Sequence, residues 1–92
     1  MFVLHIELKV KPGQSQALEK TYAEKFRPAI SAQEGFAAVQ LLRFDDTDYR
    51  LCLTFDRQAS QQKWVATALH QQVWSLVENL CAEYSVKIFS TV

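Results

Sequence analysis

Two tryptophans and a histidine lie close together in KWVATALHQQVW, the stretch from Lys63 to Trp74. Trp64 offers a flat aromatic surface. His70 carries the one type of side chain whose ordinary pKa, about 6.5, lies near neutral pH. Such a pair can hold a planar organic molecule and take a proton from its hydroxyl group. The same residues can also be ordinary packing in a small core, so their meaning depends on the elements that position them.

The segment after Thr67 has the periodicity of an amphipathic helix. At about 100° per residue its apolar residues share one sector, which predicts a buried stripe made of Leu69, Val73, Leu76, Val77 and Leu80. His70 and Trp74 are four residues apart and lie together on one flank of that stripe. If the helix continued back through Thr67, Trp64 would face water. We therefore predict a break near residues 66–68 that turns Trp64 inward.

The rest of the chain predicts strands and one more helix. Residues 2–10 alternate apolar and mixed side chains, which is typical of a strand with one buried face. From Gln14 the apolar residues recur every four positions, which predicts a helix with Tyr22 and Phe26 on its inner face. Pro28 is expected to kink or end this helix, because proline has no backbone N–H to donate.

The second half of the chain predicts a hairpin, a helical stretch and a last strand. Residues 36–44 and 49–55 are two apolar strands joined by a short polar turn, which makes them a hairpin. Residues 56 to about 81 are expected to be helical, apart from the break before Ala68. Residues 84–89 (YSVKIF) predict a closing strand.

This order, βαββαβ, predicts an α+β fold of the ferredoxin-like kind, an antiparallel sheet with two helices on one face. The 92 residues make a single domain spanning 1–92. The helices can cover only one face of the sheet, and the other face carries a mixture of apolar and polar residues. Because 49% of the residues are hydrophobic, we predict that a second copy covers this face in a homodimer.

Composition argues against several other functions. Ten basic and ten acidic residues balance, so the sequence gives no sign of binding to nucleic acid or to an anionic membrane. No segment approaches the roughly 18 apolar residues of a membrane span. Cys52 and Cys81 lack metal-ligand spacing and read as buried free thiols, and no signal-peptide pattern is visible, so we expect a cytoplasmic protein. Phosphate-loop, metal-cluster and serine-nucleophile motifs are missing, so we expect no metal and no cofactor.

Three segments carry a resemblance to a known family: ELKVKPG at Glu7–Gly13, QEGFAAVQLLRFDD at Gln33–Asp46, and WVAT at Trp64–Thr67. With them the chain resembles, nearly end to end, the antibiotic biosynthesis monooxygenase-like proteins of the dimeric α+β barrel superfamily. The resemblance implies a homodimer whose two sheets close into a barrel. Several members oxidise polycyclic phenols or quinols without metal or flavin, and relatives with the same fold cleave haem or isomerise small metabolites.

The resemblance extends to single residues only in part. Trp64 stands where the haem-cleaving relatives have a pocket tryptophan. Their iron-binding histidine comes ten residues later, where this chain has Trp74, and their first-strand asparagine is replaced by Ile6, so haem degradation is disfavoured. Other members carry a histidine at the position of Leu69, one residue before His70. One residue turns a helical side chain by about 100°, so His70 cannot simply inherit that role.

The candidate function is therefore a cofactor-independent monooxygenase that acts on a small aromatic or quinol-type molecule in a pocket between helices and sheet. We expect His70 and Trp64 to be the catalytic residues, and an aromatic set to bind the substrate: Tyr22, Phe26, Trp64 and Trp74. The alternative is a non-catalytic homodimer that binds a small ligand or has a structural role. A closed cavity between Trp64, His70 and the helix-facing side of the sheet would favour the enzyme, and a filled core would favour the alternative.

Overall fold

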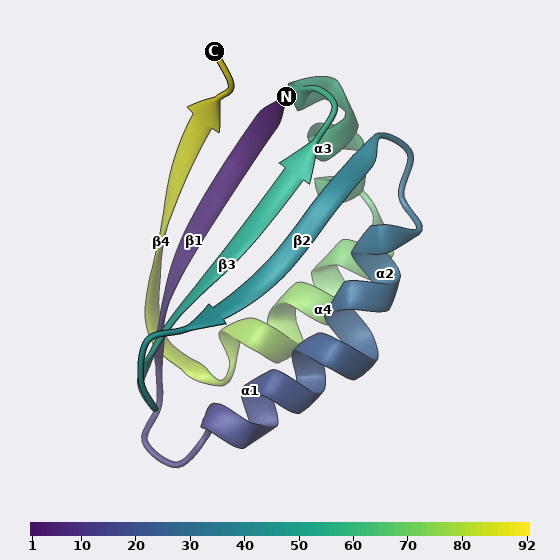
Figure 1. Cartoon of the computed structure of the whole chain (residues 1–92). Helices are drawn as coiled ribbons and strands as arrows, with labels where there is room; N and C mark the ends of the chain where they lie inside the picture. The colour runs from purple at the N-terminus through teal and green to yellow at the C-terminus, as the bar shows by residue number, and fades with distance from the viewer.

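Four strands form one antiparallel sheet in the computed structural model of the protein, which describes all residues from 1 to 92 (Figure 1). The strands are β1 (Phe2–Val10), β2 (Phe36–Arg43), β3 (Asp48–Phe55) and β4 (Cys81–Ser90). Their order in the sheet is β2-β3-β1-β4, so β1 and β3 are central and β2 and β4 are edges. This is the ferredoxin-like α+β fold that the sequence predicts.

The helical segments lie on one side of the sheet, and the opposite face is bare (Figure 1). The first group is continuous and consists of α1 (Ser15–Thr21), the π-helical turn η1 (Tyr22–Phe26) and α2 (Arg27–Ser31). The second group is α3 (Gln58–Val65) and α4 (Ala68–Glu78). None of these helices has the length and apolar character needed to span a membrane.

The last strand begins earlier than the sequence suggests. It starts at Cys81 rather than at residue 84, and the helical stretch before it ends at Glu78 rather than near residue 81. The reason is tertiary: Cys81 pairs with Val10 across the sheet, and the Leu80 carbonyl accepts a hydrogen bond from the Lys11 N–H, 2.9 Å away. These contacts with β1 draw the residues after α4 into the sheet.

Pro28 does not end the first helix, which continues to Ser31. The proline lies in the first turn of α2, where a missing backbone N–H costs little. Directly before it the chain widens into the π-helical turn, in which the Arg27 N–H bonds to the Tyr22 carbonyl. The helix thus passes the proline by adding a residue to one turn, instead of stopping.

The same π-turn explains how a four-residue repeat stays on one face. In an uninterrupted α-helix such a repeat drifts by about 40° at each step, which would separate Leu18 from Ile30 by about 120°. A π-turn holds more residues than an α-turn and so cancels part of this drift. Leu18, Phe26 and Ile30 are accordingly all buried against the sheet.

The core lies between the helices and the apolar face of β1 and β3. Alternate residues of the two strands are buried on this face: Leu4, Ile6, Leu8, Val10, Tyr49, Leu51, Leu53 and Phe55. They pack against residues from every helical segment, among them Leu18, Phe26, Ile30, Trp64, Val73 and Val77. The predicted alternation of β1 is therefore confirmed.

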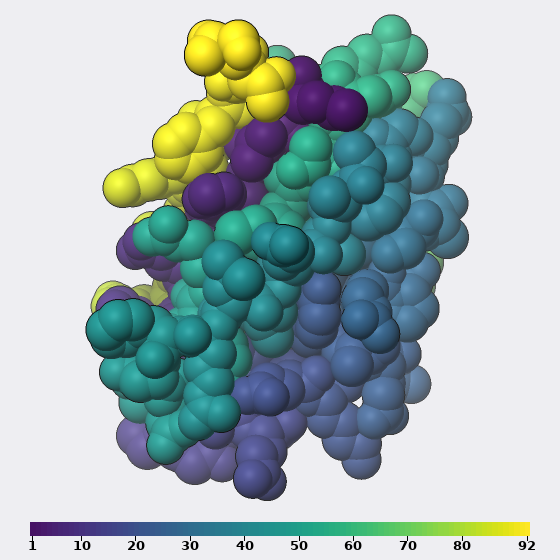
Figure 2. Space-filling view, in the orientation of Figure 1, coloured from purple at the N-terminus to yellow at the C-terminus, as the bar shows by residue number.

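The bare face of the sheet, called here the open face, is charged at one end and apolar at the other. Near the β2–β3 connection it carries the ion pairs Glu7–Arg50 and Lys9–Asp48. At the other end the register aligns Val3 with Thr54 and Phe89. The chain termini lie at this apolar end, and the last residues project from it (Figures 1 and 2).

The orientation of α4 differs from the one its apolar stripe predicts. Val73 and Val77 are buried as expected, but Leu69 and Leu76 are 41% and 46% exposed. The helix is rotated so that the flank carrying His70 turns toward the sheet. The physical reason lies in the aromatic contacts of that flank, which join His70 to Trp64 and Trp74 to Tyr84.

Candidate functional site

The predicted break between the two helices of the second group is present. α3 ends at Val65 and α4 begins at Ala68. Thr67 caps α4 through its hydroxyl group, which accepts a hydrogen bond from the His70 N–H at 3.0 Å and donates one to the Trp64 carbonyl at 2.7 Å. One side chain thus ties together the two residues predicted to be catalytic, and the change of direction leaves Trp64 only 1% exposed.

Aromatic side chains meet edge to face around Trp64. The His70 ring stands nearly perpendicular to the indole, with centroids 5.1 Å apart. On another side Phe26 approaches the same indole at 6.3 Å, also edge-on. Such perpendicular contacts match the positive edge of one ring to the negative face of the next. They fix Trp64 as the centre of a rigid aromatic group between the helices and the sheet.

The other aromatic residue on this flank of α4 makes a similar contact with the sheet. The Trp74 ring meets that of Tyr84, on β4, edge to face at 5.0 Å. With His70 held against Trp64, this second contact turns the whole flank toward the sheet. It therefore accounts for the rotation that leaves Leu69 and Leu76 exposed.

A cavity of about 180 Å³ opens beside these rings. Its walls come from three layers of the fold, with β1, β3 and β4 on the sheet side, η1 on one flank, and α3 and α4 above. Eleven residues line it, nine of them hydrophobic: Leu4, Ile6, Phe26, Leu53, Gln61, Trp64, Val65, His70, Trp74, Tyr84 and Val86. None is an Asp, Glu, Lys or Arg, so the cavity is suited to a neutral ligand.

His70 is the polar group in this cavity whose hydrogen bonding is incomplete. Its Nδ1 atom is buried and has no hydrogen-bond partner within the protein. Buried polar atoms are normally paired, so this nitrogen is an unsatisfied acceptor on a residue that lines the cavity. Burial also lowers the pKa of the His70 imidazole below its ordinary value, because a cation is poorly solvated there. At neutral pH the ring is therefore uncharged and able to accept a proton.

The structure brings together four of the five residues predicted for the site. Trp64, His70, Phe26 and Trp74 all line the cavity. Tyr22 does not, because it stacks behind Phe26 with its ring 6.4 Å away and nearly parallel. Burial raises the pKa of the Tyr22 hydroxyl, so this group stays protonated and supports the wall from behind.

The sheet side of the cavity was missed by sequence reasoning. Its residues are Leu4 and Ile6 on β1, Leu53 on β3, and Tyr84 and Val86 on β4. The alternation of each strand shows that these side chains share a face. It does not show which strands are neighbours or where the helices leave a gap, and both are needed to locate a cavity.

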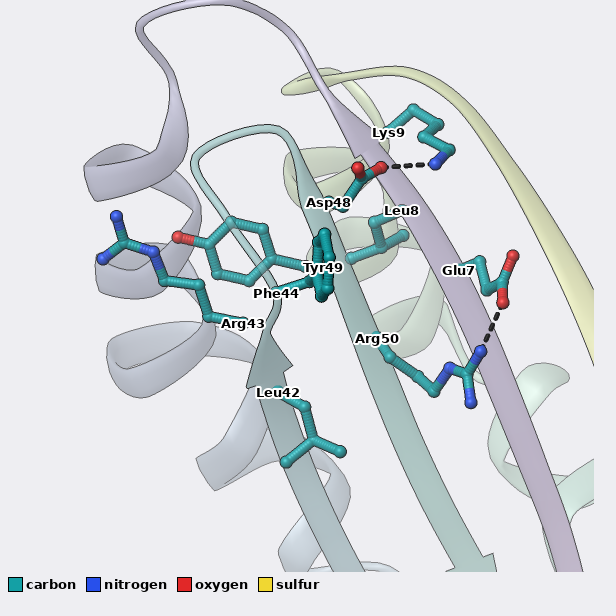
Figure 3. Close-up of a pocket in the computed structure, with 9 residues that line it drawn as sticks. All are labelled: Glu7, Leu8, Lys9, Leu42, Arg43, Phe44, Asp48, Tyr49 and Arg50. Carbon is teal, nitrogen blue, oxygen red and sulfur yellow. Dashed lines mark hydrogen bonds and ion pairs between the residues drawn. The ribbon is translucent and has the colours of Figure 1, made fainter.

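A larger hollow of about 450 Å³ lies at the hairpin end of the sheet, and Figure 3 shows its lining residues. Its charged groups are already paired with one another, as Glu7 with Arg50 and Lys9 with Asp48. Arg43 is held by Asp46 and Glu19. With its charges satisfied, the hollow presents no reactive group comparable to His70. No cluster of three or more His, Cys, Asp or Glu residues is arranged to hold a metal ion.

Comparison with known proteins gives one family. Residues 1–74 match the model of the antibiotic biosynthesis monooxygenase family. No curated protein is significantly similar to the chain. Among solved structures, the chain is similar to SnoaB, a cofactor-independent oxygenase from Streptomyces nogalater, with a TM-score of 0.88 and 16% identity over 98% of this chain and 91% of that one.

Two other structures have much the same shape. A protein from Bordetella bronchiseptica, provisionally assigned as an antibiotic biosynthesis monooxygenase, gives a TM-score of 0.86 and 23% identity, covering 99% of this chain and 97% of that one. A protein from Nitrosomonas europaea with the same provisional assignment gives 0.86 and 18%, covering 100% and 99%. At these identities the structural matches establish the fold alone.

Proposed function

Because the chain belongs to the antibiotic biosynthesis monooxygenase family, we propose that it is a cofactor-independent monooxygenase that oxidises a small hydroxylated aromatic molecule beside Trp64 and His70. The observation that carries the proposal is the buried, unpartnered Nδ1 of His70, a residue that lines a largely apolar cavity. A phenolic hydroxyl is the group that would complete this bond. The fold likeness to SnoaB, itself a cofactor-independent oxygenase, supports the same reaction class.

The chemistry follows from the neutral imidazole and the dry walls. A substrate ring lies against Trp64, and His70 Nδ1 takes the phenolic proton as a general base. The electron-rich anion then reduces O₂ directly. One oxygen atom becomes a new ring carbonyl and the other leaves as water, so that a monohydroxy arene and O₂ give a quinone and H₂O. The apolar lining limits the contact of the reactive anion with water.

Oxygen uptake with 1-naphthol and related monohydroxy arenes whose para position is free tests the proposal. Uptake should persist after treatment with a chelator, and His70→Gln should reduce kcat/KM by roughly a hundredfold or more, the usual size of a general-base contribution. Gln71→Ala is the matched control, because Gln71 is exposed on the same helix and should keep the wild-type rate. Equal rates in His70→Gln and wild type would refute a catalytic role for His70.

A second outcome separates catalysis from simple binding. If the same phenols bind with one-to-one stoichiometry but none is oxidised, the protein is the non-catalytic ligand-binding alternative. That alternative is compatible with a cavity in which His70 is the one group able to act as a base near neutral pH.

We further propose that the working form is a homodimer joined through the open face of the sheet. Val3 and Phe89 make the end of this face near the chain termini apolar, and a second copy would cover them. A stable interface of this kind should exceed about 1,000 Å² in total. The two cysteines are free thiols, one of them buried, and we propose the reducing cytoplasm as the location.

A further inference from the structure

The volume of the cavity limits the ring system that fits beside Trp64. A cavity of roughly 150 Å³ holds one benzene ring, and pockets for drug-sized ligands begin near roughly 300 Å³. At about 180 Å³, this cavity suits one ring or two fused rings. A planar system of three or more fused rings would have to leave a ring outside the cavity or displace Phe26 or Trp64, which are each 1% exposed and packed against one another.

Apolar side chains continue from the mouth of the cavity onto the protein surface. Val86 lines the cavity and is 46% exposed, so its side chain belongs partly to the cavity and partly to the surface. Ile88, two residues further along β4, is opposite Leu4 in the sheet and so points to the helix side, where it is 62% exposed. Val65 forms the facing rim from α3 and is also exposed.

These side chains form what we call the β4 strip, consisting of Val65, Val86 and Ile88. Along an antiparallel strand, Val86 and Ile88 are roughly 6.8 Å apart, a distance that a chain of about five or six carbons covers. The strip carries no charge and runs on from a cavity without charged residues. An aliphatic chain attached to the bound ring is therefore the occupant that matches both its length and its chemistry.

From this continuity we infer that the ligand is a one- or two-ring phenol or quinol that carries an aliphatic substituent, with the ring beside Trp64 and His70 and the chain along the β4 strip. The inference rests on the proposed function in placing the ring in the cavity, but it concerns binding and not turnover. The chain would cover the apolar side chains that the helices leave exposed, and each buried methylene would add to affinity.

Titration calorimetry with 4-methylphenol and 4-hexylphenol tests the inference. In both compounds the para position is blocked, so binding is measured without quinone formation. The longer chain should bind roughly tenfold or more tightly, since each buried methylene is worth about two- to fourfold. Ile88→Gln should cut this ratio to about threefold or less and leave 4-methylphenol nearly unchanged. Leu76→Gln, on the opposite flank of α4, is the matched control and should keep the wild-type ratio.

Several results would overturn the inference. These are a ratio near one in the wild type, an unchanged ratio in Ile88→Gln, and no binding of either phenol. The mass of each protein is also measured by light scattering. If Ile88→Gln has half the mass of the wild-type protein, a second copy covers the β4 strip, and this result too would overturn the inference. In a separate arm, 1-naphthol should bind at least about tenfold more tightly than 1-anthrol, and equal affinities would refute the limit on ring size.

Failure of this inference is distinguishable from failure of the proposed function, because binding and oxygen uptake are measured separately. Chain-dependent binding of the alkylphenols, together with no oxygen uptake from 1-naphthol, would leave the ligand class standing and remove the oxygenase. Oxygen uptake that depends on His70, together with affinity that ignores chain length, would remove the ligand class and leave the oxygenase.

Discussion

Gly35 and Gly13 form a matched pair for testing how the start of α3 is held in place. Both glycines have a φ of +79°, a region where other residues are strained. A methyl group added at Gly13 would meet nothing within 4 Å. One added at Gly35 would lie 2.3 Å from Ser60 Oγ and 2.5 Å from Asp56 Oδ1. Alanine at the two positions therefore differs in steric contact but not in backbone conformation.

The expected cost follows from these distances. Gly13→Ala should lower the free energy of unfolding by about 1 kcal/mol, because a left-handed alanine costs about 1–2 kcal/mol and its stiffer unfolded chain returns part of that. Gly35→Ala carries the same cost plus overpacking against Ser60, which is 6% exposed and has little room to move. Forcing extra volume into such a site costs about 1–3 kcal/mol, so the total should be about 2–4 kcal/mol.

Urea unfolding followed by tryptophan fluorescence, at one fixed protein concentration, measures both variants. The difference between them should be about 1–3 kcal/mol. Because α3 carries Trp64, Gly35→Ala should also weaken binding of 4-methylphenol, whereas Gly13→Ala should not. Equal losses of stability in the two variants would refute the steric reasoning, because they would leave only the shared backbone cost.

Three other predictions test separate parts of the structure. Burial lowers the pKa of His70 in the folded protein. The contribution of His70 to the free energy of unfolding is therefore fully present above the unfolded pKa of about 6.5 and is lost as the pH falls below it. Urea unfolding between about pH 5 and 7 should show this decline, and His70→Gln should flatten it. Val3→Lys would place a charge at the apolar end of the open face and should give a monomer by light scattering with an unchanged circular dichroism spectrum; a persistent dimer would contradict pairing through that face. Thr67→Ala removes the cap of α4 and should lower thermal stability by about 1 kcal/mol, whereas Thr67→Ser should keep most of it; equal losses would show that the hydroxyl contributes nothing.

Much of the fold follows from local patterns in the sequence. The alternation of residues 2–10 defines the buried face of β1, and the order of the elements defines the ferredoxin-like plan. The break at Thr67 was predictable because an unbroken helix would have placed Trp64 in water. In each case the information lies within a few neighbouring residues, since side-chain direction repeats with the period of the strand or helix.

The π-turn at Tyr22–Phe26 is an intermediate case. The apolar repeat of four residues predicted a helix that Pro28 would kink or end, and it did not predict the wider turn. Packing of Leu18 and Ile30 on the same sheet favours that turn. The cost of the missing N–H is local, whereas the gain from keeping both residues buried depends on the whole sheet.

The candidate site also has some features that the sequence predicted and others that only the tertiary structure decided. The sequence by itself put Trp64 and His70 close together, and it identified Phe26 and Trp74 as aromatic candidates. Only the tertiary structure decided that α4 turns its histidine flank to the sheet, that Tyr22 lies behind the wall, and that β4 supplies the remaining side of the cavity. Rotation of a helix about its axis is set by the partners it meets. For α4 these are Trp64 and the β4 residue Tyr84, and contact with an edge strand leaves no periodic trace in the helix's own sequence.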